Sequence, residues 1–307
     1  MNHDSLSRAS TARLAPMPDD SHANPWVDAC EGPLRSRPPG SRLLPARLLA
    51  LLSGLLAVAA SAGAVTPAQV CHAASGAQRG ALVELYTSEG CSSCPPADRW
   101  FAALAHAANP DNLSLLAFHV DYWDSIGWVD RFGAGAFSAR QRDRVLAATG
   151  GHTVYTPQVM LGERVGFHWS SSADVVAGLR AVVSQPGALS FDIDAKRAGD
   201  GFDVALKAMP HGAPSLPSGS LYLALYENDL STQVKAGEND GVLLRHERVV
   251  RRLLGPYPLA GAQWARDLHM APPRDARIDH LGLTAFAQSA KGDTLQALSL
   301  PLDACAR

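Results

Sequence analysis

The sequence contains few cysteines, few charged residues and no long hydrophobic run. Five cysteines among 307 residues are too few for a disulfide-rich scaffold. Lys and Arg total 27 and Asp and Glu total 29, so no excess of positive charge indicates a partner such as nucleic acid or an anionic membrane. Apolar residues are abundant at 47%, which is enough for folded cores, and the length predicts about two domains.

The first part of the chain is typical of a targeting segment. Residues 1–41 are polar and show no periodicity, and residues 42–64 contain two arginines, an apolar run from Leu48 to Ala60 and a series of small residues. This layout predicts a signal peptide at 42–64 behind a polar extension. A membrane anchor is the alternative, but a span needs about 20 apolar residues. We therefore expect a periplasmic or secreted protein without a stable membrane span after signal cleavage.

Residues 65–187 alternate between strand-like and helix-like patterns. Strands are predicted at 81–87, 113–120, 158–161 and 165–167, and helices at 96–108, 138–148 and 172–184. This order, with short connections, predicts an α/β thioredoxin-like fold.

A Cys-Ser-Ser-Cys motif lies between the first predicted strand and the first predicted helix of this region. Backbone N–H groups and the dipole at a helix start favour a thiolate on Cys91. The spacing places Cys94 within one turn, where it can form the Cys91-Cys94 disulfide and release a mixed disulfide. An inert structural disulfide and half of a zinc site remain alternatives, although no second cysteine pair completes a zinc site.

Two further residues could assist this chemistry. Pro157 begins a predicted strand, and we expect a cis bond after Thr156 that leaves the Thr156 backbone open to an extended substrate; an ordinary trans turn is the alternative. Glu84 lies in the apolar strand before the motif and could relay the proton of Cys94, unless it is a solvated surface residue.

Polar and aromatic residues follow the second predicted strand, at the sheet edge where open sheets bind ligands. They include His119, Asp121 and Trp123, which we expect to contact substrate. His119 could tune Cys91 or join both thiolates in a soft metal site, or it could be a hydrogen-bonded core residue. The sequence predicts no metal site and no cofactor.

Four segments in this order resemble a known family: VELYTSEGCSSCPPAD, FHVDYWDSIGW, FSARQR and VYTPQVMLGE. The chain is similar over about residues 80–300 to the secreted thioredoxin-like family catalogued as domain-of-unknown-function family 1223. The resemblance implies an exported bacterial protein with a thioredoxin-fold domain followed by a β-rich domain. The residues of this sequence that match the family's motifs are Cys91, Cys94, His119, Asp121, Trp123 and Pro157. It implies no substrate.

Residues 188–307 lack helical patterns and predict a mainly β, sandwich-like domain. Strands are predicted at 189–194, 202–208, 220–226, 241–253, 281–289 and 295–300. Residues 237–241 predict a tight turn, with a metal loop as the weaker alternative because it offers few oxygen ligands. Cys71 and Cys305 bracket the exported chain, and we expect them to form a Cys71-Cys305 disulfide.

These features predict a thiol-disulfide oxidoreductase that acts on exported protein thiols or on a redox partner protein. Cys91 would be the nucleophile and Cys94 the resolving cysteine, with Pro157 orienting the substrate. Two alternatives remain. One is a periplasmic Cu(I)-binding protein that uses Cys91, Cys94 and His119, and the other is a non-enzymatic adaptor with a structural disulfide.

Overall fold

The computed structural model describes residues 69–109 and 111–306. The predicted polar extension at 1–41 and the predicted signal peptide at 42–64 lie outside the described residues. Among the residues described, no helix combines the length and the apolar character needed to cross a membrane.

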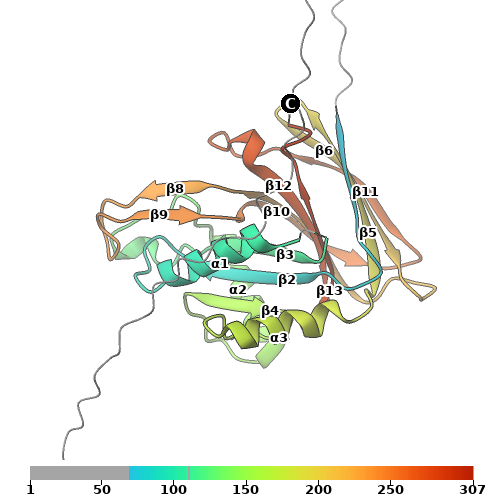
Figure 1. Ribbon diagram of the computed structural model, residues 1–307, viewed down its shortest axis with the longest axis horizontal. Coiled ribbons are helices and arrows are strands. Elements are labelled where there is room, and N and C mark those ends of the chain that lie inside the picture. The colour runs from blue at the N-terminus through green and yellow to red at the C-terminus, as the bar shows by residue number, and fades with distance from the viewer. Residues whose placement is uncertain (1–68, 110, 307) are drawn as a thin grey trace, which may run out of the picture. The chain divides into compact units, whose positions relative to one another are not determined.

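The first half of the described chain alternates strands and helices (Figure 1). Its elements are β1 (Val70–Ala74), β2 (Ala81–Thr87), α1 (Pro95–Ala107), β3 (Leu113–His119), the single-turn helix η1 (Asp124–Ile126), α2 (Gly135–Thr149), β4 (Gln158–Leu161) and α3 (Ser172–Val183). All of β2 is buried because side chains of α1 and α3 pack on one face of it and side chains of α2 pack on the other. Two prolines start α1, which costs little because first-turn N–H groups lack intrahelical partners.

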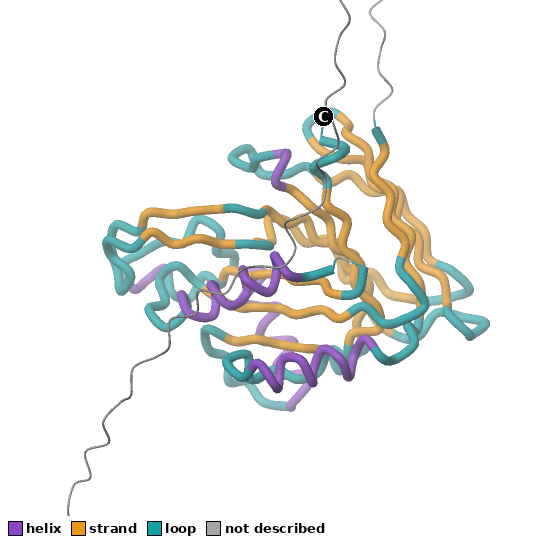
Figure 2. The backbone as a smooth tube through the Cα atoms, viewed as in Figure 1, coloured by secondary structure: helices purple, strands orange, loops and turns teal. Residues whose placement is uncertain are grey.

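The second half is built from strands. They are β5 (Leu189–Ala198), β6 (Gly201–Pro210), β7 (Gly219–Glu227), β8 (Leu230–Gln233), β9 (Leu243–His246), β10 (Val249–Leu259), β11 (Trp264–Met270), β12 (Leu281–Gln288) and β13 (Thr294–Pro301), with the short helix η2 (Ile278–His280) before β12. Figure 2 shows how strands dominate the described chain.

The prediction of an α/β thioredoxin-like domain followed by a separate β domain is wrong. Strands β2, β3 and β4 form one end of a seven-stranded sheet of order β13-β12-β7-β10-β3-β2-β4, so strands from both halves of the sequence share it. The junction is the parallel pairing of β10 with β3, where Ala117 N–H donates to the Arg248 carbonyl oxygen at 2.9 Å. Hydrophobic periodicity identifies strands but does not identify their neighbours. Over the described residues the architecture is a mostly β assembly of sheets with three α-helices.

A four-stranded sheet of order β1-β5-β6-β11 packs in sandwich-like fashion against the seven-stranded sheet. Its alternating inner residues, such as Phe191, Ile193 and Leu206, share one core with Leu223 of β7 and Leu283 of β12. The expected disulfide between Cys71 and Cys305 is formed in this core, which confirms that pairing. The disulfide ties β1 to the segment that follows β13.

Strands β8 and β9 form a separate two-stranded sheet that extends from the end of β7 over the start of α1 (Figure 1). The single strand predicted at 241–253 is therefore two strands, β9 and β10. The expected tight turn at residues 237–241 is confirmed, and Gly237 and Gly241 both have positive φ there, at 76° and 79°. The strand predicted at 165–167 is not formed.

Candidate functional site

Cys91 and Cys94 form a disulfide at the point where β2 leads into α1, as predicted. Cys94 is the N-cap residue of α1, and its backbone N–H donates to the Cys91 carbonyl oxygen at 3.1 Å. The dipole at this helix start favours a thiolate on Cys91 after reduction, although the two prolines of the first turn provide no N–H groups. Both cysteines are fully buried, whereas Ser92 and Ser93 between them are exposed.

The Thr156-Pro157 segment lies beside this motif, and its peptide bond is cis as expected. Ser93 connects the two, because its hydroxyl lies 3.3 Å from the Cys91 sulfur and donates to the Thr156 carbonyl oxygen at 3.5 Å. The Trp123 indole N–H donates to the Thr156 hydroxyl oxygen at 2.8 Å. The structure therefore brings together five of the predicted site residues, Cys91, Cys94, Thr156, Pro157 and Trp123.

Asp121 and His119 have other partners. The backbone N–H of Asp121 donates to the Ser138 hydroxyl oxygen at 3.2 Å, and that hydroxyl donates to the Asp121 carboxylate, so Asp121 is tied to the first turn of α2. His119 is fully buried, and its Nδ1 lies 2.6 Å from the Asp130 carboxylate. Burial lowers the pKa of His119, but Asp130 outweighs that effect and the pKa is raised.

His119 belongs to a group of five buried ionisable residues that we call the acid-histidine cluster. Its members are Glu89, Asp98, His119, Asp130 and His246. The rings of His119 and His246 meet edge to face at 4.8 Å between centroids, and His246 Nε2 lies 3.4 Å from the Glu89 carboxylate. Burial would raise the pKa of Asp130, but the contact with His119 and two backbone N–H donors hold it at about 2.

Asp98 is the member of the acid-histidine cluster on the cysteine-bearing helix. It lies four positions after Cys94 in α1, and residues with this spacing occupy the same face of a helix. Its carboxylate accepts a hydrogen bond from the Thr87 hydroxyl at 2.9 Å. Burial raises the pKa of Asp98, although both histidines of the cluster act in the opposite direction. A raised pKa makes the ionised carboxylate a stronger proton acceptor than an ordinary aspartate.

Glu84 lies away from the cysteine pair. Successive residues of a strand point to opposite faces, and the Glu84 side chain points to the α2 face of β2 while Thr87 points to α1. It accepts hydrogen bonds from Arg140 at 3.1 Å, from Gln288 and from Tyr86. Only 1% of its surface is exposed, so the solvated alternative is wrong, and this position does not support the predicted proton relay.

The tip of the β8-β9 hairpin covers the cysteine motif. The Asn239 amide donates to the carbonyl oxygens of Glu89 at 2.8 Å and Cys91 at 3.0 Å. The Glu238 carboxylate accepts from the Ser92 hydroxyl at 2.6 Å and from the Ser92 backbone N–H at 3.2 Å. These bonds lower the pKa of Glu238. Residues more than 140 positions downstream therefore complete the surroundings of Cys91.

The sequence interpretation missed Asp98, His246, Glu238 and Asn239. Asp98 had a usable signal, because an acidic residue four positions after the second cysteine of a helix start lies on the cysteine face. No local pattern places His246 in the acid-histidine cluster or the residue 237–241 turn beside Cys91. Those contacts depend on the course of β8 and β9, which periodicity does not predict.

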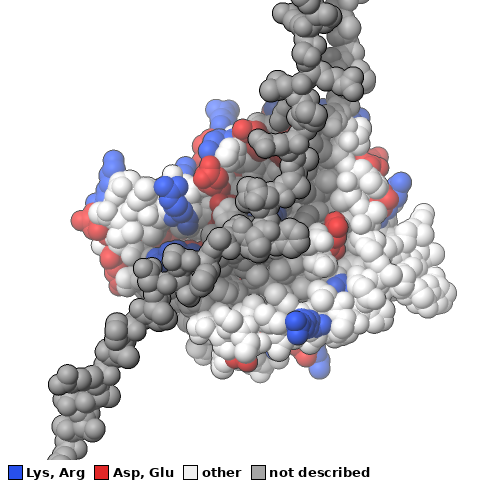
Figure 3. Space-filling model, in the orientation of Figure 1, with Lys and Arg blue, Asp and Glu red and all other residues white. Residues whose placement is uncertain are grey.

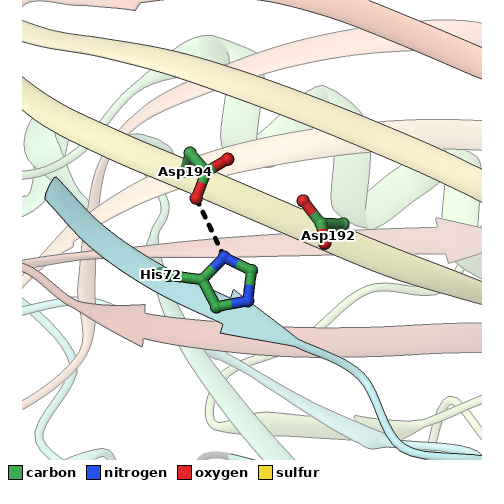
Figure 4. A group of neighbouring side chains, drawn as sticks. All are labelled: His72, Asp192 and Asp194. Atoms are coloured by element: carbon green, nitrogen blue, oxygen red, sulfur yellow. Dashed lines mark hydrogen bonds and ion pairs between the residues drawn. The ribbon is translucent and has the colours of Figure 1, made fainter.

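One group of side chains in the described part of the chain has metal-ligand spacing. His72, Asp192 and Asp194 offer ligand atoms within 4.8 Å of one another on the neighbouring strands β1 and β5 (Figure 4). The His72 and Asp194 side chains are 55% and 43% exposed, and His72 Nδ1 is bonded to Asp194 at 2.8 Å. Cys91, Cys94 and His119 do not form such a group.

The space-filling view in Figure 3 shows acidic and basic side chains interspersed on one face of the molecule.

Comparisons with known proteins identify the family and the fold. The pattern of the family described as "Protein of unknown function (DUF1223)" matches residues 82–288. No curated protein matches. A structural genomics target from Agrobacterium tumefaciens, known from a crystal structure, shares 23% sequence identity with this chain, with a TM-score of 0.51. The match covers 72% of this chain and 93% of the Agrobacterium chain. HBP35 of Porphyromonas gingivalis shares 12% sequence identity with this chain, with a TM-score of 0.53. The match covers 75% of this chain and 77% of the HBP35 chain.

At these identities the two structures show a shared fold alone, whereas the family match spans most of the chain and includes the cysteine motif, Trp123 and Thr156-Pro157. The resemblance to family 1223 is therefore confirmed as far as family membership goes, and the chain belongs to the DUF1223 family of proteins of unknown function.

Proposed function

We propose that this protein is a thiol-disulfide oxidoreductase that acts on protein thiols through Cys91 and Cys94. The observation that carries the proposal is the position of the disulfide at the start of α1, beside the Thr156-Pro157 segment. A helix start stabilises the thiolate that attacks a disulfide, and the Ser93 hydroxyl 3.3 Å from the Cys91 sulfur can donate to the same thiolate.

The reduced pair would act in two exchanges that conserve electrons. The Cys91 thiolate attacks a substrate disulfide, which forms a mixed disulfide and releases one substrate sulfur as a thiolate. Cys94 loses its proton and attacks the Cys91 sulfur, which restores the Cys91-Cys94 disulfide and releases the second substrate sulfur. We assign Asp98 as the acceptor of the Cys94 proton, because it shares the helix face of Cys94 and burial raises its pKa. Oxidation of a substrate runs the same steps in reverse.

The substrates in this proposal are exported proteins or a redox partner protein. The predicted signal peptide and the two disulfides support a periplasmic or secreted site of action, since disulfides persist in oxidising compartments. Trp123 and Thr156 offer an aromatic face and a backbone segment beside the cysteine motif for an extended polypeptide.

Two assays with the full chain test the proposal. Reduced wild-type protein should reduce insulin, or the oxidised protein should oxidise reduced ribonuclease, and Cys91→Ser should abolish the activity. Cys94→Ser should accumulate a mixed disulfide because the resolving sulfur is missing. The Cys71→Ser/Cys305→Ser double variant is the control and should keep the activity. Wild-type rates equal to those of Cys91→Ser in both assays would refute the proposal.

A structural disulfide is the second candidate function for this pair, because neither sulfur reaches the surface. The reduction potential of the Cys91-Cys94 pair distinguishes a catalytic pair from a structural disulfide. A catalytic pair has a potential between about −120 and −270 mV, whereas structural disulfides lie below about −300 mV. Equilibration with glutathione, followed by alkylation and peptide mapping of Cys91 and Cys94, gives the value.

A further inference from the structure

The side chains of the residue 237–241 turn form hydrogen bonds with the cysteine motif and with Glu89 just before it. Asn239 and Glu238 bind Cys91 and Ser92 respectively, and Asn239 is only 5% exposed. Gly237 packs closely on the loop after η1, where a Cβ added to Gly127 would lie 3.3 Å from Gly237 Cα. We call residues 237–241 the flap.

The flap is bounded by residues that permit movement. Gly237 and Gly241 have φ of 76° and 79°, a region that glycine enters and leaves without steric cost. The two strands that carry the flap stay anchored by buried side chains such as Leu230 and Leu244. Hinge residues are few and lie at the ends of the moving segment, which is the arrangement found here.

Cys91 and Cys94 are both fully buried while the flap lies on the cysteine motif, so a substrate sulfur cannot reach them in this arrangement. An in-line attack requires direct contact between two sulfur atoms. The Asn239 amide also occupies the carbonyl oxygens of Glu89 and Cys91, which are acceptors that backbone N–H groups of an extended polypeptide could use.

We infer that the flap controls access to the cysteine pair, with Glu238 and Asn239 as positioning residues that hold it closed until an extended polypeptide displaces them. This inference rests on the proposed function, since it names the regulation of the same site. It assigns a substrate class as well, because the acceptors released by opening suit peptide N–H groups.

The test is the rate at which dithiothreitol reduces the Cys91-Cys94 disulfide in the oxidised full chain, followed by rapid alkylation and peptide mapping. Asn239→Ala and Glu238→Gln should each accelerate reduction about tenfold, because Asn239→Ala removes two hydrogen bonds to carbonyl oxygens and Glu238→Gln weakens the two that Ser92 donates to the carboxylate. Asn239→Asp should be as fast as Asn239→Ala, since a carboxylate is repelled by the two carbonyl oxygens.

Asp240→Asn is the matched control. It removes one carboxylate from the same flap, and Asp240 is exposed with no side-chain hydrogen bond to the cysteine motif in the described residues. Its reduction rate should equal that of wild type. Equal rates for wild type, Asn239→Ala and Glu238→Gln would overturn the inference, and so would an equal acceleration by Asp240→Asn.

This assay needs no enzymatic turnover. If the flap variants accelerate reduction but wild type and variants fail in both protein assays, the proposed oxidoreductase function fails while the flap is supported. If the protein assays succeed and the variants leave the reduction rate unchanged, the flap inference alone fails.

Discussion

At the scale of single residues, two buried carboxylates near β2 have opposite pKa shifts. Burial would raise the pKa of Glu84, but Arg140 and Arg144 outweigh it and hold the pKa at about 2. Burial raises the pKa of Asp98, and no arginine compensates it among the described neighbours that act on its pKa. Glu84 is therefore an anchor between β2 and α2 that is ionised at neutral pH, while burial makes Asp98 a stronger proton acceptor on the helix that Cys94 caps.

Glu84→Gln should lower the free energy of unfolding by about 3 kcal/mol at pH 7, because it leaves two buried guanidinium groups without their carboxylate. The folded pKa lies below the ordinary 4.5, so the stabilisation is complete above pH 4.5 and is lost as the pH falls toward 2. Urea unfolding from pH 7 to pH 2.5 measures the difference between wild type and variant.

The matched control for this substitution is Glu163→Gln, at an exposed position. It should change the unfolding free energy little at any of these pH values. A difference between wild type and Glu84→Gln that stays constant from pH 7 to pH 2.5 would contradict the assignment of an ionised, arginine-paired Glu84.

Asp98→Asn should separate activity from stability. The amide can still accept the Thr87 hydrogen bond, and removing a buried carboxyl whose pKa is raised costs no stability at pH 7, where its ionised form is unfavourable. The resolving step should slow about 100-fold, because a positioned proton acceptor is missing. Stopped-flow release of the mixed disulfide measures that step, and an unchanged rate would exclude Asp98 as the proton acceptor.

At the scale of elements, the local patterns predicted most strands and helices around the site. β2, α1, β3, α2, β4 and α3 all occur close to the expected residues, because buried runs and helical periodicity determine them locally. The strands β1, β8 and β11 were not predicted, since their exposed faces dilute the apolar pattern. The contact of the flap with Cys91 and the position of His246 depend on long-range packing and had no local signal.

The start of β2 shows how tightly the elements meet. Gly80 lies directly against the backbone of Ala297 in β13, and a Cβ at this position would overlap the Ala297 carbonyl group. Gly80→Ala should lower the free energy of unfolding by about 2 kcal/mol, because β2 must move away from β13. Gly76→Ala is the control, since no atom lies within 4 Å of its added Cβ. Equal urea midpoints for both variants would contradict this packing.

At the scale of the whole molecule, one sheet joins the cysteine-bearing strands to the second half of the sequence. β3 has β2 on one side and β10 on the other, and Arg140 of α2 donates to Gln288 of β12 at 2.8 Å. The sequence predicted the strands of both halves, but the pairing of β3 with β10 could not be predicted because it depends on which strand edges remain free after folding.

The disulfide between Cys71 and Cys305 joins the two ends of the described chain. Its sequence separation is 234, so it closes a long loop and lowers the conformational entropy of the unfolded chain. Cys71→Ser/Cys305→Ser should lower the free energy of unfolding by about 4 kcal/mol. Guanidinium unfolding measures the loss, and a change below about 1 kcal/mol would contradict a stabilising role.

If the protein is exported as we propose, the same disulfide sets a problem for the order in which the chain is delivered across the membrane. Of the four disulfide-bonded cysteines, Cys71 would emerge first, Cys91 and Cys94 would follow within a short stretch, and Cys305 would emerge 234 positions after its partner. During that interval the sulfurs within reach of Cys71 are those of the cysteine motif. An oxidising catalyst that links cysteines in order of appearance would join Cys71 to Cys91, and native protein would then require isomerisation of that bond.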